Sequence, residues 1–118
     1  MTPLTESAIR DFLFAQTDAW NRRDKDAFMA LYRAHAAQGL TLEYMGKALL
    51  TGEAAWAGLN SMWDQYVPKV RQQLFEVIVN GTDAACYYRN IWTAEQTLST
   101  GMEFYAFKDG GLHIRMFH

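Results

Sequence analysis

Glu103 is the side chain with the most informative chemistry, because it is an acid within a strand-like run of large residues, Met102 to Tyr105. An acid with such neighbours lies either on the solvated face of a sheet, paired with an arginine of the next strand, or in a polar pocket. Burial in a pocket raises the pKa of a carboxyl group toward values that suit general acid or base catalysis. We take Glu103 as the candidate catalytic residue, and both placements stay open.

Two arginines come from strand-like segments near this acid, Arg89 and Arg115. An arginine that faced Glu103 would keep the carboxylate ionised, as a fixed hydrogen-bonding charge or as half of a pair that activates water. We therefore include both arginines among the candidate ligand-binding residues.

The turn at Asp109-Gly110 decides which way Arg115 faces. A two-residue turn would pair Tyr105 with Ile114 and turn Arg115 away from the face of the acid. A three-residue turn would pair Tyr105 with Arg115 instead. The sequence does not choose between the two registers.

Aromatic residues are unusually frequent, with four Trp, six Tyr and seven Phe. Most are expected in the core or at a dimer surface. Some, with Trp63 and Tyr105 among the candidates, are expected to line an apolar cavity on whose walls a ring can stack. The predicted ligand is a small apolar molecule, flat or cyclic.

The sequence predicts no metal site and no cofactor. His35, His113 and His118 are widely spaced, and no Cys/His cluster has the spacing of a zinc site. Cys86 is the single cysteine and is interpreted as a packed thiol. No glycine-rich phosphate loop and no nucleophile elbow are present.

Helical periodicity and turn signals predict the elements that must position these side chains. One helix begins at Thr2-Pro3 or at Thr5-Glu6 and ends near residue 22, and a second is capped by Asp24. The turns Asn80-Gly81 and Asp109-Gly110 favour hairpins. The fold class is α+β, with three helices on one face of a strongly curved, mainly antiparallel sheet. The expected helices are 2–22 or 5–22, 24–34 and 53–66, and the expected strands are 40–45, 48–50, 70–79, 84–93, 101–107 and 112–117.

Length and charge exclude several classes of protein. The 118 residues suit one domain, 1–118. A net charge of −2 and a pI of about 5.8 argue against binding to nucleic acid. No stretch has the length and hydropathy of a membrane span or a signal peptide. We expect a soluble, cytoplasmic protein in a reducing compartment.

Several landmarks in this order resemble the nuclear transport factor 2-like superfamily, and most closely its small bacterial members, the SnoaL-like polyketide cyclases and the ketosteroid-isomerase-like proteins. The resemblance covers essentially the whole chain. It rests on Trp20 late in the first helix, Arg23-Asp24 before the second, Leu31-Tyr32 within it, Gly52-Glu53 at the start of the third, and a closing hairpin through residues 107–112.

The resemblance implies a cystatin-like cone with a pocket at its wide end, and a homodimer formed through the outer face of the sheet. It also implies roles for four positions. Gln16 takes the place of the oxyanion-hole tyrosine of the steroid isomerases, Tyr44 that of the general base, Glu103 that of the second oxyanion-hole acid, and Asn60 that of a supporting tyrosine. Since a phenol cannot replace a carboxylate as the base, steroid isomerisation is not expected.

Two hypotheses for function follow. In the first, the chain is a cofactor-independent isomerase, cyclase or hydrolase of a small apolar compound, with Glu103 as acid and base and with Gln16, Asn60 and Tyr44 orienting the substrate. In the second, it is a dimeric ligand-binding or protein-interaction domain without chemistry.

Overall fold

The first two helices begin at capping residues visible in the sequence. The computed structural model describes residues 3–118 and has helix α1 at Glu6–Arg22. The Thr5 hydroxyl accepts from the Ala8 amide at 3.1 Å, so the helix begins at the Thr5-Glu6 signal; the alternative start includes Thr2, which lies outside the described residues. Helix α2, Lys25–His35, follows a left-handed residue, Arg23 (φ 59°), and is capped by Asp24.

Helix α3, Gly52–Tyr66, ends just before Pro68, which cannot donate the hydrogen bond of a continuing helix. Its buried side is made by Ala55, Leu59 and Trp63. Among residues 3–118, no helix is long and apolar enough to cross a bilayer.

Six strands form one mixed sheet in the order β2-β1-β6-β5-β4-β3. Within residues 3–118, only the β1–β6 pair is parallel. Strand β1 precedes the β3–β6 meander in the chain and pairs with its last strand. The strands are β1 Gly39–Tyr44, β2 Leu50–Thr51, β3 Val70–Asn80, β4 Asp83–Trp92, β5 Thr97–Lys108 and β6 Gly111–Phe117.

The hairpin at Asp109-Gly110 is the two-residue alternative. Tyr105 pairs with Ile114, and both turn residues have positive φ, 52° and 79°. Arg115 consequently faces away from Glu103. Strand β5 starts earlier than the sequence predicts, since its pairing with β4 continues to Trp92 opposite Thr97.

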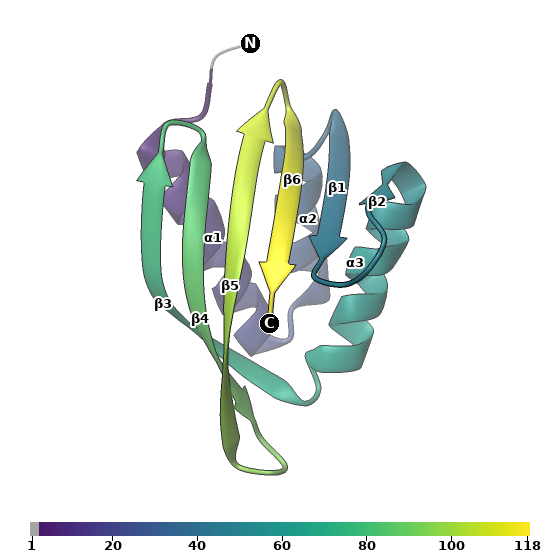
Figure 1. Cartoon of the computed structure of the whole chain (residues 1–118), viewed down its shortest axis with the longest axis vertical. Coiled ribbons are helices and arrows are strands. Elements are labelled where there is room, and N and C mark those ends of the chain that lie inside the picture. Colours follow the sequence, from purple (N-terminus) through teal and green to yellow (C-terminus); the bar gives the residue numbers. More distant parts are fainter. Residues whose placement is uncertain (1–2) are drawn as a thin grey trace.

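The three helices cover one face of the sheet and leave the other open (Figure 1). The inner face carries the core, and its members alternate along each strand, as with Ala84, Cys86 and Tyr88 on β4. A β-bulge between Leu74 and Glu76 interrupts the β3–β4 pairing. Such bulges bend a strand, and β3 curves at its lower end.

Candidate functional site

Glu103 lies on the inner face of β5 and is buried, with 8% of its surface exposed. Its position follows from strand alternation, because Gly101, Tyr105 and Phe107 share its face while Met102 and Phe104 are exposed on the other. The carboxylate has a partner at each oxygen, Tyr105 at Oε1 and His118 at Oε2. Glu103 is therefore not on the solvated face of the sheet, which was one of the two placements that its sequence left open.

Behind Glu103, a buried polar network connects the sheet to the helices through Gln16 of α1. The Tyr32 hydroxyl donates to Gln16 Oε1. Gln16 Nε2 donates to the Tyr105 hydroxyl at 2.7 Å and to the Tyr88 hydroxyl at 3.1 Å. Tyr105 in turn donates to Glu103 Oε1. The Gln16 amide is thus fully used inside the protein.

Burial raises the pKa values of Tyr32, Tyr88 and Tyr105 well above their usual value, and the nearby charge of Glu103 raises them further. These phenols therefore stay protonated at neutral pH. They can hold a carboxylate by hydrogen bonds, and they are poor proton acceptors.

On its exposed side, Glu103 is paired with His118. His118 Nε2 lies 2.7 Å from Glu103 Oε2, and His118 Nδ1 lies 3.0 Å from the Asn90 amide nitrogen. Asn90 is buried on β4, and its Oδ1 accepts from Gln72 Nε2 at 3.2 Å. The His118 side chain is 18% exposed and that of Glu103 is 10% exposed. The pair thus forms the border between the buried network and solvent.

The His118 ring fits over a glycine. A Cβ built on Gly101 would lie 2.6 Å from two ring carbons, Cγ and Cε1, which is closer than any side chain tolerates. The ring of Tyr88 lies nearby, with its centroid 6.2 Å away and its plane tilted by 31°. The imidazole therefore lies in a flat slot, which is formed by Gly101, Tyr88 and the polar partners Glu103 and Asn90.

The predicted ligand-binding residues are only partly brought together. Gln16 and Tyr105 lie in the network. Tyr44 lies beside His118 and is 37% exposed, with its hydroxyl 3.5 Å from the His118 carbonyl oxygen. Asn60 lies on the exposed side of α3. Trp63 packs in the core, with ring centroids 4.8 Å from Phe28 and 5.8 Å from Trp20.

Both candidate arginines lie on the outer face of the sheet, opposite to Glu103. The Arg89 guanidinium sits 4.1 Å from the ring centroid of Phe75. Arg115 is bonded to Glu43 at 3.3 Å, and Glu43 also pairs with His113. Neither arginine forms a charge pair with the candidate catalytic acid.

A hollow of about 260 Å³ also lies on this outer face rather than at Glu103. Apolar side chains of Ile78, Ala85 and Phe104 line it, and Asp83 and Arg115 stand beside it. On the inner face, the aromatic side chains pack against one another, as Phe12 does with Tyr32 at 5.2 Å and with Phe107 at 5.6 Å.

Cys86 is a buried free thiol. Burial raises its pKa well above its usual value, and the charge of Glu103 adds to the shift, so the nucleophilic thiolate is strongly disfavoured. Within residues 3–118, no three His, Cys, Asp or Glu side chains come together as metal ligands would.

Sequence reasoning missed His118 and Asn90, although a signal for both was present. With the two-residue turn, Met102 pairs with Phe117, and the next position places Gly101 beside His118. Strand alternation puts His118 on the face of Met116 and Ile114, and puts Asn90 on the face of Tyr88. Once the turn is fixed, a glycine facing a ring on the inner face is predictable.

Comparison with known proteins supports the fold. The sequence matches no protein-family model and no curated protein. It is similar in structure to a protein of unknown function with a cystatin-like fold from Methylobium petroleophilum PM1, with a TM-score of 0.74, 18% identity, and coverage of 98% of this chain and 78% of that one.

Two further solved structures are similar to this chain in fold. An NTF2-like protein of unknown function from Cytophaga hutchinsonii has a TM-score of 0.67 and 14% identity, over 98% of this chain and 91% of that one. A candidate SnoaL-like polyketide cyclase from Jannaschia sp. CCS1 has a TM-score of 0.69 and 13% identity, over 91% and 82%. The chain therefore has the nuclear transport factor 2-like, cystatin-like fold, which the landmarks of its sequence indicate.

Proposed function

We propose that the chain is a small-molecule-binding protein that catalyses cofactor-independent proton transfer on a small, cyclic, largely apolar compound, as an isomerase, cyclase or hydrolase. One observation carries this proposal: a buried carboxylate, Glu103, has one oxygen anchored to Tyr105 and the other directed to the solvent border at His118. A carboxylate held in this way is suited to take and return a proton.

In this proposal Glu103 acts at Oε2, from which the bound substrate displaces His118 Nε2, its partner at 2.7 Å in the structure. As an isomerase or cyclase, it takes a proton from a substrate atom made acidic by an adjacent carbonyl or ring, and it returns that proton to a second atom of the same molecule. As a hydrolase, it takes a proton from water while the water oxygen bonds to the substrate, and it gives that proton to the leaving group as the bond to that group breaks. No net proton is consumed in either case. Tyr105 keeps its hydrogen bond to Oε1 throughout and holds the carboxylate in place. Gln16 acts as a positioning residue for Tyr105, because its amide is bonded within the protein.

The substrate would approach Glu103 beside Tyr44, which is 37% exposed and whose hydroxyl lies 3.5 Å from the His118 carbonyl oxygen. The similarity in fold to a candidate SnoaL-like polyketide cyclase fits a small organic substrate. A cytoplasmic location is part of the proposal, and the single cysteine, a free thiol, fits a reducing compartment.

The test is a thermal-shift screen against small cyclic ketones, epoxides, steroids and aromatic acids, followed by a turnover assay on every compound that raises the melting temperature. We expect Glu103→Gln to keep binding and to lower kcat by about 100-fold or more. Glu95→Gln, an exposed glutamate on the β4–β5 turn, is the matched control. A hit whose turnover survives Glu103→Gln would contradict the assignment.

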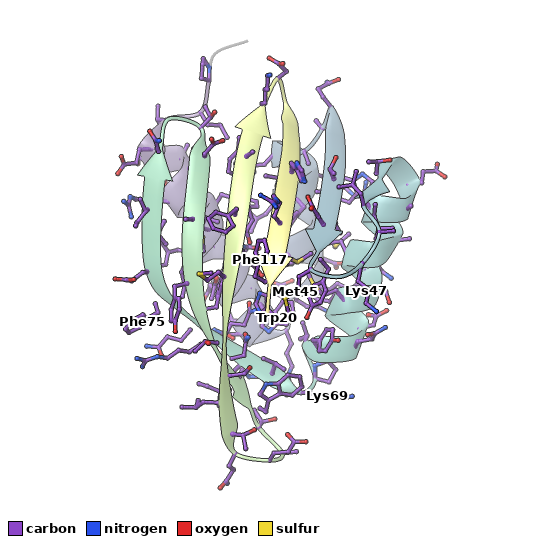
Figure 2. All side chains as sticks on the ribbon, in the orientation of Figure 1. Trp20, Met45, Lys47, Lys69, Phe75 and Phe117 are labelled. Carbon is purple, nitrogen blue, oxygen red and sulfur yellow. The ribbon has the colours of Figure 1, made fainter. Side chains whose placement is uncertain are left out.

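A second candidate function, a dimeric binding domain, is favoured by the outer face of the sheet. Ile78, Met102 and Phe104 are exposed there, at 67%, 45% and 40%. Figure 2 shows Phe75 and Phe117 on the side of the strands that the helices leave open. Strands that are apolar on both faces are typical of sheets covered on both sides. We propose a second copy of this chain as the covering partner.

A further inference from the structure

We propose that two copies of this chain interlock through the open face of the sheet, with Phe104 of each copy in the hollow of the other and with Asp83 of each paired to Arg115 of the other. The proposal rests on the second candidate function, the covering of this face by a second copy. It adds which side chains meet and how the two copies are turned. It does not depend on a catalytic role of Glu103.

The hollow is a gap that two small side chains leave on the outer face of the sheet. The strand register places Ala85 opposite Phe104 and Ala106 opposite Asp83. The two alanines are therefore diagonal neighbours on β4 and β5. Larger apolar side chains, Ile78 and Phe104, border the hollow of about 260 Å³ that lies over them. Because its lining is mainly apolar, it is better filled by an apolar side chain than by water.

Phe104 is a side chain that such a hollow can accept. It is 40% exposed on the same face, and its ring contacts that of Phe117 edge to face, with the centroids 5.8 Å apart. An exposed ring next to an apolar hollow is a self-complementary pair of features. In a symmetric dimer each copy can place its ring in the hollow of the other, because the same patch is used twice.

The order of these features on the sheet fits a two-fold axis. Asp83, the hollow and Phe104 follow one another along a diagonal from β4 to β5, and Arg115 lies opposite Phe104 on β6. An axis that lies between two packed sheets, and that passes between the hollow and Phe104, exchanges these two features. The same axis carries Asp83 beyond Phe104 toward β6, beside Arg115 of the other copy. The strands of the two copies then cross steeply, as in the orthogonal class of packed sheets.

The two charges that this axis brings together are opposite in sign and exposed. Asp83 is an exposed residue, and it takes part in none of the ion pairs formed within residues 3–118. The Arg115 side chain is 51% exposed and uses its Nε for Glu43, at 3.3 Å. Its terminal NH₂ groups can therefore donate to a second carboxylate. Since each copy supplies one carboxylate and one guanidinium, the interface contains the pair twice.

The test exchanges the two charges in separate proteins. We expect Asp83→Arg alone and Arg115→Asp alone each to raise the dimer Kd by about 10-fold or more, because each variant brings two like-charged pairs together. Mixed in equal amounts, the two variants should form a heterodimer in which both pairs are again opposite in sign, with a Kd within about threefold of wild type. Analytical ultracentrifugation measures the Kd, native mass spectrometry identifies the heterodimer, and circular dichroism checks that each variant is folded.

Arg89→Asp is the matched control for the charge exchange. Arg89 is also an arginine on the outer face, but it lies over Phe75 and away from the diagonal. Mixed with Asp83→Arg, it should form no heterodimer of wild-type affinity. Recovery with either arginine variant would show a general effect of charge and would overturn the pairing.

A second measurement addresses the hollow. We expect Ala106→Leu to fill it, to exclude the ring of Phe104 from the other copy, and to raise the dimer Kd by about 10-fold or more. Ala94→Leu, on the exposed β4–β5 turn, is the control and should leave the Kd unchanged. A dimer that accepts Ala106→Leu without loss of affinity would show that Phe104 does not enter the hollow.

The outcomes separate the interlock from the functions on which it builds. A wild-type dimer that the two charge variants do not weaken, or whose weakened variants do not recover when mixed, keeps the second copy and overturns the interlock. A wild-type protein that is monomeric at all concentrations overturns both. None of these measurements uses turnover, so the role of Glu103 is decided by its own assay.

Discussion

Gln16 is the residue on which the buried polar network depends. Its amide accepts from Tyr32 and donates to Tyr88 and Tyr105, and each of these hydroxyls lies in the core. Leucine has a similar volume and no polar atom, so it leaves the Tyr32 hydroxyl without its acceptor and removes the donors to the other two.

We therefore expect Gln16→Leu to lower the free energy of unfolding by about 2 to 4 kcal/mol, measured by urea denaturation. Gln65→Leu is the matched control, because Gln65 is exposed and bonded only to Ser61. It should change stability by less than about 0.5 kcal/mol. Equal effects of the two substitutions would show that the network adds no stability.

Gly101 provides a second test at the scale of the residue, since a Cβ there would displace the His118 ring from Glu103. We expect Gly101→Ala to destabilise the protein by about 1 to 3 kcal/mol. In a His118→Gly background, the same change should cost almost nothing, because the ring is absent. A double-mutant cycle by thermal or urea unfolding measures this coupling, and an additive result would contradict the contact.

Among the elements, the β5–β6 hairpin has the most influence on the site, because its register decides which side chains share the face of Glu103. Asp109 and Gly110 both have positive φ. Alanine at Gly110 is strained in that conformation, and we expect Gly110→Ala to lower stability by about 1 kcal/mol or more in urea titrations. Asp109→Asn tolerates the same φ and should be nearly neutral. A neutral Gly110→Ala would show that the turn does not hold the register.

The elements also show how much the sequence could predict. The sequence predicted the ends of the helices within a residue or two. The signals were the N-caps Thr5 and Asp24 and the helix-ending Pro68, which act on their immediate neighbours in the chain. The early start of β5 was missed. Its residues at 97–100 are exposed, and the pairing with β4 that makes them a strand cannot be seen in a local pattern.

The site was predicted less completely, for a related reason. Glu103 could be chosen from its neighbours and from the resemblance, but the facing of Arg89 and Arg115 depended on register. In the sequence, His118 is a histidine far along the chain from His35 and His113, which does not indicate a metal site. Its role depends on contacts with Glu103 and Asn90, which lie 15 and 28 residues away, and only the folded sheet brings them together.

At the scale of the whole molecule, the open face of the sheet predicts association. Phe104 is 40% exposed beside the hollow on that face. If a second copy covers it, Phe104→Asp should convert a dimer into a folded monomer, seen by light scattering with an unchanged circular dichroism spectrum.

Phe14→Asp is the control for this prediction, because Phe14 is also exposed, at 52%, and it lies on α1. It should leave the dimer intact. A wild-type protein that is monomeric at all concentrations would contradict the covering by a second copy.

The whole fold should also be sensitive to alkali, because its core contains three tyrosines with pKa values raised by burial, Tyr32, Tyr88 and Tyr105. In the unfolded chain these phenols ionise near a pKa of about 10. Above that pH the unfolded state releases protons that the folded state keeps. Their contribution to stability is therefore fully present below about pH 10 and is lost as the pH rises above it.

We expect the free energy of unfolding to fall above about pH 10 by about 1.4 kcal/mol per pH unit for each of the three tyrosines. Phenolate absorbance from these three should appear together with the loss of helical circular dichroism, because the core must open before they can ionise. Tyr88→Phe removes one of them and should make the fall shallower by about a third. If ionisation of the three were complete while the helical signal persisted, the network would be open to solvent, and the anchoring of Glu103 by protonated tyrosines would be wrong.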